Sequence, residues 1–178
     1  MMGKRSDFVR RERDFYATPY EAFMPLKEHL PQEPFGFAEP CAGDGALVDH
    51  IEETTDGWCT WASDIEPKDK GILLRGFNDV CDIDCYEADY IITNPPWDRK
   101  MLHPMIEHFV RLKPTWLLFD ADWIHTKQSK PYQHLIQKIV SIGRVKWIPG
   151  TKSVGKDNCC WYLFDEHYDG VTKFYGKK

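Results

Sequence analysis

A strand-like run passes into a glycine-rich turn in the stretch Phe35-Gly36-Phe37-Ala38-Glu39-Pro40-Cys41-Ala42-Gly43-Asp44-Gly45. The apolar residues at 35–39 predict a short strand, and residues 46–53 predict a helix that begins directly after the turn. Gly43 and Gly45 permit positive φ angles and a close approach of the backbone, as a nucleoside cofactor at the first strand-to-helix crossover requires. The third glycine of a dinucleotide fingerprint is absent, which argues against NAD and FAD.

Strands and helices alternate along the rest of the chain. Short apolar runs predict further strands at 58–63, 74–77 (the weakest), 90–93, 116–119, 144–148 and 160–164. The spacing of apolar residues predicts further helices at 18–30, 101–112 and 132–142. This order indicates an α/β fold with a seven-stranded mixed sheet, mostly parallel with a C-terminal antiparallel hairpin, and helices on both faces.

The first of these helices carries a start signal and an internal conflict. Thr18 is expected to be its N-cap, Pro19 to lie in its first turn and Glu21 to complete a capping box. Pro25 lacks the N–H that a helix interior needs, so we expect a kink or an early end there.

The composition predicts a single soluble domain. A chain of 178 residues buries about two-thirds of its unfolded surface, and 42% of the residues are hydrophobic. The net charge of −5 argues against binding nucleic acid through bulk electrostatics, so any such contact requires a local basic patch. Because no apolar run reaches the length of a membrane span and residues 1–5 lead into charge, we expect a cytoplasmic protein.

The cysteines indicate reduced thiols in the core. They lie mostly in apolar strand-like runs, at Cys41, Cys59, Cys81, Cys85, Cys159 and Cys160. Cys81 and Cys85 with a nearby histidine have the wrong spacing for a zinc site, and we predict no metal.

A second motif, Asn94-Pro95-Pro96-Trp97, directly follows the strand-like run 90–93. The two prolines have fixed φ angles and no N–H, which makes this corner stiff. The side-chain oxygen of Asn94 and the carbonyl of Pro95 offer two acceptors to a planar –NH₂ group, and the ring of Trp97 offers a surface on which a heteroaromatic base can stack. The alternative is a proline-rich strand terminator with a surface tryptophan.

Acidic residues follow the strand-like runs. Asp64 ends the second strand, where a carboxylate typically holds ribose hydroxyls, although Asp64-Ile65-Glu66-Pro67 also has the composition of a turn. Asp79 and Asp82 precede the Asn94 strand. Either can accept a hydrogen bond from an adenine amino group, and either can be a solvated loop carboxylate.

In this order the segments resemble the S-adenosylmethionine-dependent amino-methyltransferases, most closely the compact, phage-type DNA adenine-N6 methyltransferases. The resemblance extends over residues 15–165 and rests on Phe15-Tyr16-Ala17-Thr18-Pro19, the glycine motif at 37–45, Asp64, Asp79 and the Asn94 motif. It implies a Rossmann-like class I methyltransferase with S-adenosylmethionine as cofactor. The implied cofactor-binding residues are Tyr16, Thr18, Glu39, Cys41, Ala42, Gly43, Gly45, Asp64, Ile65 and Asp79, with Asp82 in reserve for Asp79. The implied catalytic residues are Asn94, Pro95, Pro96 and Trp97.

The resemblance further implies methyl transfer to the N6 amine of an adenine that is flipped out of DNA into the pocket at Asn94, in the host cytoplasm if the protein is phage-encoded. The sequence leaves the biological role open, and restriction partnership and protection of a phage genome are both compatible with it. Larger family members carry a target-recognition domain. Here we expect a charged arm at 1–14 and one catalytic domain at 15–178. Recognition then falls to 4–13, to 127–130 or to the loop with Lys152 and Lys156, each of which is equally explained as solvated charge.

The same catalytic motif occurs in enzymes that methylate a glutamine amide of translation release factors and in some RNA adenine methyltransferases. A primary amide presents the same –NH₂ group, so the motif leaves these substrates open. A binding protein of the same fold without turnover is a further alternative.

Overall fold

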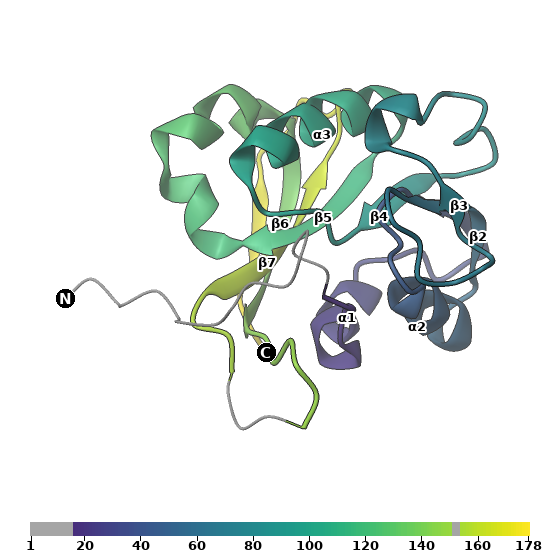
Figure 1. Cartoon of the computed structure of the whole chain (residues 1–178). Helices are drawn as coiled ribbons and strands as arrows, with labels where there is room; N and C mark the ends of the chain where they lie inside the picture. The colour runs from purple at the N-terminus through teal and green to yellow at the C-terminus, as the bar shows by residue number, and fades with distance from the viewer. Residues whose placement is uncertain (1–15, 151–153) are drawn as a thin grey trace.

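The computed structural model describes residues 16–150 and 154–178 (Figure 1). The helices are α1 (Tyr20–Lys27), α2 (Ala46–Thr54) and α3 (Arg99–Leu112), with 3₁₀ segments η2 (Phe77–Asp79), η3 (Ala121–His125) and η4 (Lys127–Leu135). The strands are β1 (Phe35–Glu39), β2 (Gly57–Asp64), β3 (Leu73–Leu74), β4 (Tyr90–Thr93), β5 (Thr115–Asp120), β6 (Ile136–Arg144), β7 (Asn158–Phe164) and β8 (Lys173–Tyr175). No helix among these described residues is long and apolar enough to cross a membrane.

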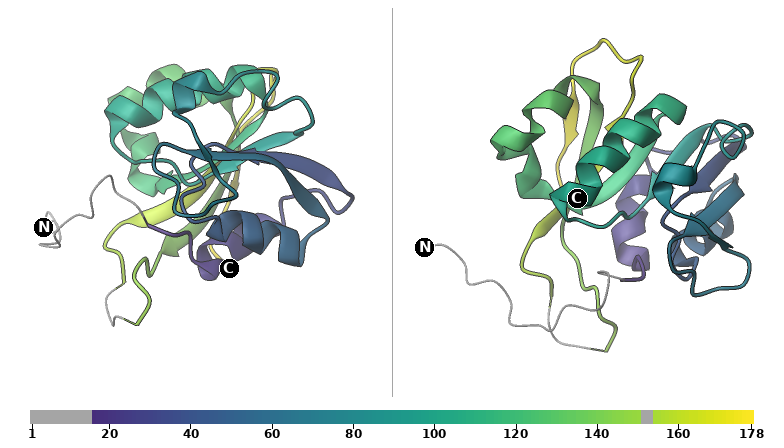
Figure 2. Two further views of the ribbon diagram at one scale, coloured as in Figure 1. Left: turned by 45° about the vertical axis from the view of Figure 1, so that its right-hand side comes forward. Right: turned by 45° about the horizontal axis from the view of Figure 1, so that its top comes forward.

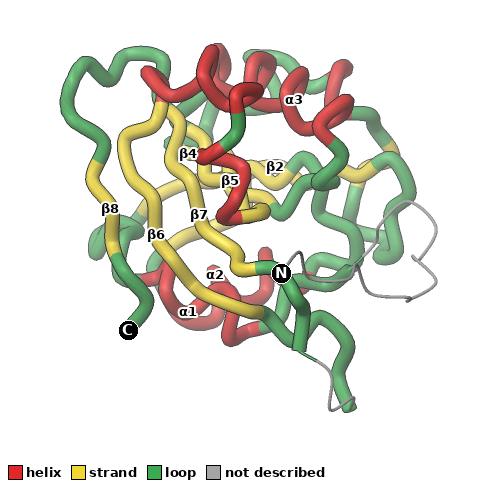
Figure 3. Tube along the Cα trace, turned by 90° about the vertical axis from the view of Figure 1, so that its left-hand side faces the viewer, coloured by secondary structure: helices red, strands yellow, loops and turns green. Residues whose placement is uncertain are grey.

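The strands form a mixed sheet in the order β3-β2-β1-β4-β5-β7-β6-β8. Strand β7 runs antiparallel to both of its neighbours, and the other neighbouring strands pair in parallel. Figure 3 shows β8, β6 and β7 side by side at one end of the sheet. The expected α/β class and mixed sheet are therefore confirmed, but the sheet has eight strands rather than seven because β8 adds to β6.

Helices cover both faces of the sheet, as Figures 1 and 2 show. Buried residues of α1 and α2, among them Phe23 and Leu47, pack in one hydrophobic core cluster. Buried residues of α3, among them Ile106 and Phe109, pack in the other. Because both faces are covered, β1 is buried over its whole length, including Glu39, and its sequence does not alternate between apolar and polar residues.

The predicted helix at 132–142 is wrong. Residues Ile136–Arg144 form β6, which pairs antiparallel with β7, and the preceding residues form η4. The apolar spacing misled because β6 contains register shifts between Ile136 and Lys138 and between Ser141 and Gly143, which interrupt the alternation of a regular strand. The predicted strand at 144–148 is also wrong, because β6 ends at Arg144 and residues 145–148 are not in a strand.

The start of the first helix also differs from the prediction. Its N-cap is Pro19, without a side-chain capping bond, so Thr18 is not the cap and Glu21 completes no capping box. The helix ends at Lys27, soon after Pro25, as the expected early end required. The weak third strand lies at Leu73–Leu74 rather than at 74–77.

Candidate active site at the carboxyl edge of the sheet

The carboxyl ends of β1, β2 and β4 meet at one edge of the sheet. The chain leaves β1, builds β2 and β3 on one side, and returns to β4 on the other side of β1. Such a switch point is where open α/β sheets bind ligands. Two hydrogen bonds join the first two strand ends: Ala42 N–H donates to the Ser63 carbonyl at 2.9 Å, and Gly43 N–H donates to Asp64 Oδ2 at 2.9 Å.

The glycine turn has the backbone conformation that the sequence predicted. Gly43 has a φ of 57° and Gly45 a φ of 85°, and Gly45 is also the N-cap of α2. A side chain in this left-handed region costs about 1–2 kcal/mol. The turn therefore brings backbone to the switch point without a Cβ atom in front of it.

Asp64 holds the glycine turn and its own turn together. Its Oδ2 accepts from Gly43 and its Oδ1 accepts from the Glu66 N–H at 2.7 Å. The turn role that the sequence suggested is therefore present. A carboxylate accepts about four hydrogen bonds, so both oxygens can still accept from a ligand hydroxyl. Ile65 follows with 60% of its surface exposed.

Glu39 is a buried acid at the end of β1. Only 1% of it is exposed, and burial raises the pKa of its carboxyl group well above the usual range, with the Asp64 charge adding to the effect. Its Oε2 has no hydrogen-bond partner among the described residues, and neither does the hydroxyl of Ser63 near the end of β2. Buried polar atoms without partners are rare. A further one among the described residues, Trp116 Nε1, lies near the start of β5.

Two smaller residues complete the turn. Ala42 is buried. Burial also raises the pKa of the Cys41 thiol, which therefore stays protonated and is not an activated nucleophile. Within the described ranges, no three His, Cys, Asp or Glu side chains gather as a metal site would require.

Asn94 meets a residue from the far end of the sequence. Its Nδ2 donates to the Thr18 hydroxyl at 3.3 Å, across 76 residues, and its Oδ1 accepts from Trp97 Nε1 at 3.3 Å. Thr18 is only 5% exposed. The structure thus brings Thr18, Asn94 and Trp97 together, and Thr18 contacts Asn94 instead of capping its helix. Pro95 is buried and Pro96 half-buried beside them.

Trp97 is half-buried and packs against both hydrophobic core clusters, so it is not the surface tryptophan of the alternative interpretation. Its indole N–H also donates to the Leu118 carbonyl at 3.1 Å, on the central strand β5. The ring of Trp147 lies edge-on to it, with ring centroids 5.5 Å apart, and Tyr16 lies 6.4 Å from Trp147. Trp147 was missed because its contact with Trp97 is long-range and no local pattern marks it.

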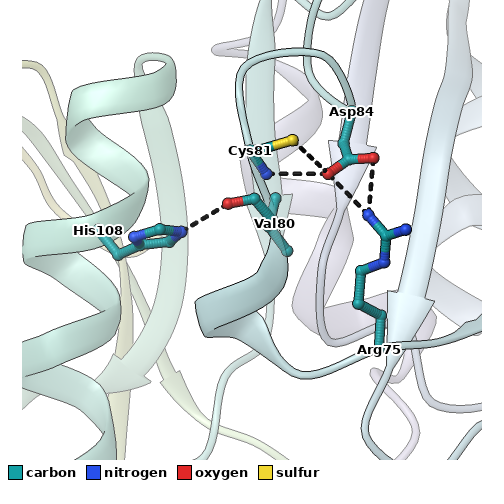
Figure 4. A network of polar contacts seen from close by, with 5 residues as sticks. All are labelled: Arg75, Val80, Cys81, Asp84 and His108. Atoms are coloured by element: carbon teal, nitrogen blue, oxygen red, sulfur yellow. Dashed lines mark hydrogen bonds and ion pairs between the residues drawn. The ribbon is translucent and has the colours of Figure 1, made fainter.

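The segment between β3 and β4 carries the two acids proposed for adenine. Figure 4 shows how Asp84, in the same segment, is held. Arg75 Nη1 donates to both carboxylate oxygens of Asp84 at 2.9 Å, and the N–H and thiol of Cys81 donate to Oδ2 of the same carboxylate. The Val80 carbonyl lies 2.8 Å from the His108 ring on α3. This network fixes the segment on both sides.

Asp79 and Asp82 are both exposed in that segment. Asp82 lines an open hollow of about 540 Å³ with Thr60 and Trp61, which lie before the carboxyl end of β2. Asp79 ends η2, directly before the buried Val80. The hollow thus places Asp82 beside the middle of β2 rather than at its end.

One of the basic stretches contacts the residue that begins α3, just after the Asn94 motif. Lys127 and Lys130 are exposed in η4, and Gln128 between them accepts from Arg99, the first residue of α3. Arg99 follows the Asn94 motif closely in the chain. Lys156 is exposed before β7, whereas residues 4–13 and Lys152 lie outside the described residues.

Solved structures share this fold. A candidate RNA methyltransferase from Pyrococcus horikoshii is 15% identical over 84% of this chain and 85% of its own, with a TM-score of 0.61. A candidate class I S-adenosylmethionine-dependent methyltransferase from Listeria monocytogenes is 12% identical over 89% of this chain and 62% of its own, with a TM-score of 0.53. The modification subunit of a candidate type I restriction enzyme from Vibrio vulnificus YJ016 is 14% identical over 91% of this chain and 47% of its own, with a TM-score of 0.51.

The chain therefore has the Rossmann-like fold of class I methyltransferases. It spans about half the length of the restriction-enzyme subunit. No family model matches the chain, and no curated protein matches it. Because one fold hosts many activities, the activity has to be argued from the site.

Proposed function

We propose that this chain transfers a methyl group from S-adenosylmethionine to the exocyclic N6 amine of adenine in DNA. The observation that carries the proposal is the Asn94 side chain, fixed at the end of β4 between Thr18 and Trp97, beside the glycine turn of the switch point. The fold shared with proteins described as methyltransferases supports it. The order of motifs from Tyr16 to Trp97 supports it as well.

The residues at the switch point fit the cofactor. The turn at Gly43 and Gly45 leaves room for it, Asp64 offers acceptors to ribose hydroxyls, and the unpartnered Oε2 of Glu39 offers an acceptor to a donor group. Tyr16, Thr18, Cys41, Ala42 and Ile65 are the further residues that we assign to its binding. For the adenine ring we choose Asp79 over Asp82, because Asp82 lies beside the middle of β2.

S-adenosylmethionine would supply a methyl group activated by its sulfonium sulfur. The chain's part is to prepare the amine, whose lone pair is delocalised into the adenine ring. Acceptors at Asn94 Oδ1 and the Pro95 carbonyl bind its two N–H groups and favour a nitrogen whose lone pair points out of the ring plane. Such preorganised acceptors stabilise the positive charge that develops on nitrogen, an effect of several kcal/mol. The nitrogen then releases a proton, which becomes acidic only after the new N–C bond forms.

A base inside a duplex cannot reach Asn94, so we propose that it is flipped out and held against Trp97, with Trp147 as a second aromatic wall. We also propose that residues 15–178 act as one catalytic domain after the arm at 1–14. The basic residues Arg99, Lys127 and Lys130 would then contact the phosphate backbone near the pocket.

The test is methyl transfer to a defined product. The purified protein is incubated with methyl-labelled S-adenosylmethionine and unmethylated DNA, and the nucleosides are identified after digestion. We expect N6-methyladenine, lost in Asn94→Ala and kept in Asn158→Ala, which removes an exposed asparagine at the start of β7. If the label were found in RNA or in a glutamine amide instead, that molecule and not DNA would be the substrate. Cofactor binding without transfer to any of these substrates would identify a non-catalytic binding protein.

A further inference from the structure

The two ends of the Asn94 side-chain amide have different partners. Its Nδ2 group donates to the Thr18 hydroxyl, and its Oδ1 accepts from the indole N–H of Trp97, each at 3.3 Å. The amide of an asparagine can rotate by half a turn and exchange the two ends. At any one position beside the amide, one orientation presents the oxygen acceptor and the reversed orientation presents the NH₂ donor. Catalysis by Asn94 needs the acceptor, so it depends on which orientation is held.

The two partners differ in what they can enforce. A hydroxyl donates or accepts, so Thr18 pairs with either end of the amide. An indole N–H is a donor only, so Trp97 pairs with Oδ1 and opposes the Nδ2 group. In the reversed orientation two donors would face each other, and the half-buried indole N–H would lose this acceptor.

The indole cannot turn to follow Asn94. The same N–H donates to the Leu118 carbonyl at 3.1 Å, and Leu118 is fully buried on β5. The ring also packs against both core clusters and against the edge of Trp147. Trp97 is thus a fixed donor, and the Asn94 amide takes the orientation that turns Oδ1 toward it.

We propose that Trp97 is a positioning residue that sets the orientation of the Asn94 amide through its indole N–H. The consequence for turnover rests on the proposed function. Oδ1 has two lone pairs, so one accepts from Trp97 and the other remains for the amine of the substrate. A reversed amide would present N–H groups to that amine and abolish its acceptor. A phenylalanine or tyrosine ring at this position can stack on a base but cannot select the orientation in this way.

The test compares Trp97→Phe, which keeps an aromatic ring and removes the N–H, with the wild-type protein. The side-chain amide signals of Asn94 are followed by NMR in the ¹⁵N-labelled chain and assigned by their absence in Asn94→Asp. We expect one sharp pair of signals in the wild type and a doubled or broadened pair in Trp97→Phe. Thr18→Val should keep one pair, because the indole still selects Oδ1. This readout does not depend on any activity.

Turnover gives the second readout. In Trp97→Phe we expect kcat to fall about three- to tenfold, which is about 0.6–1.4 kcal/mol, with KM for both substrates within about twofold of wild type. Unchanged Asn94 signals in a folded Trp97→Phe would overturn the inference, and so would doubled signals in Thr18→Val, which would assign the role to Thr18. Absence of methyl transfer by the wild type would overturn the proposed function alone.

Discussion

Replacing Asp64 with alanine tests the link between the second strand and the glycine turn. The carboxylate accepts from Gly43 N–H at 2.9 Å and from Glu66 N–H at 2.7 Å. Gly43 is buried and its bond to Asp64 is partly buried, so its N–H loses its partner in a place of low solvent access, whereas the Glu66 contact is exposed. The change therefore acts on stability and, through the ribose acceptors, on cofactor binding.

The stability loss can be worked from these two bonds. A buried donor left without its partner costs about 1–3 kcal/mol, and an exposed bond contributes little by comparison. We expect Asp64→Ala to lower the free energy of unfolding by about 2 kcal/mol. For a domain of this size that corresponds to a fall in Tm of about 4–8 °C.

Thermal and urea unfolding measure the first effect, and calorimetric titration with S-adenosylmethionine measures the second. Asp64→Asn keeps one oxygen and is expected to lie between wild type and alanine in both. Asp69→Ala is the matched control, because Asp69 Oδ1 accepts from Gly71 N–H within its own exposed turn. If Asp64→Ala kept the wild-type Tm and cofactor Kd, the reasoning about this carboxylate would be refuted.

Three further changes follow from the site. Glu39→Gln should become more stable relative to wild type as pH rises from 5 to 8 in urea unfolding. In the wild type the raised pKa keeps the folded carboxyl protonated, while the unfolded one ionises above about pH 4.5. The wild-type free energy of unfolding therefore falls by up to about 1.4 kcal/mol per pH unit, and glutamine does not share this fall. Lys127→Ala with Lys130→Ala should raise KM for DNA and flatten its salt dependence by about one to two units of slope, with cofactor Kd unchanged. Gly45→Ala should cost about 1–2 kcal/mol in unfolding, because its φ is 85°.

Each of these has a contrary outcome. A stability difference between Glu39→Gln and wild type that is the same at pH 5 and pH 8 would show that Glu39 has no raised pKa. An unchanged salt slope would remove Lys127 and Lys130 from the DNA contact. An alanine tolerated at position 45 without loss would mean that the turn does not need its left-handed conformation.

The Asn94 motif and the glycine turn were predictable because they are local. Pro95 and Pro96 have restricted φ angles wherever they lie, and Gly43 and Gly45 supply positive φ in any turn. Their positions after short apolar runs predicted that they follow strands, and both do. The acid at position 64 was found for the same reason, since it ends β2.

The last third of the fold was harder to predict. The apolar residues of 136–142 satisfy a helical spacing, and they form a strand only because β7 pairs with them along their length. The bulges hide the alternation that would mark a strand, and backbone pairing with the distant β7 then outweighs the local pattern. Strand β8 was missed because its residues are mostly exposed and carry no apolar run.

The sequence by itself determined the α/β class, the glycine turn at the first crossover and the acceptor motif at Asn94, because each depends on a few neighbouring residues. Only the tertiary structure decided what Asn94 contacts. Thr18 leaves its expected capping role to meet Asn94 across 76 residues, and Trp147 meets Trp97 from beyond β6. The physical reason is that the sheet order brings the strand ends together. Side chains with no local pattern then become neighbours through packing alone.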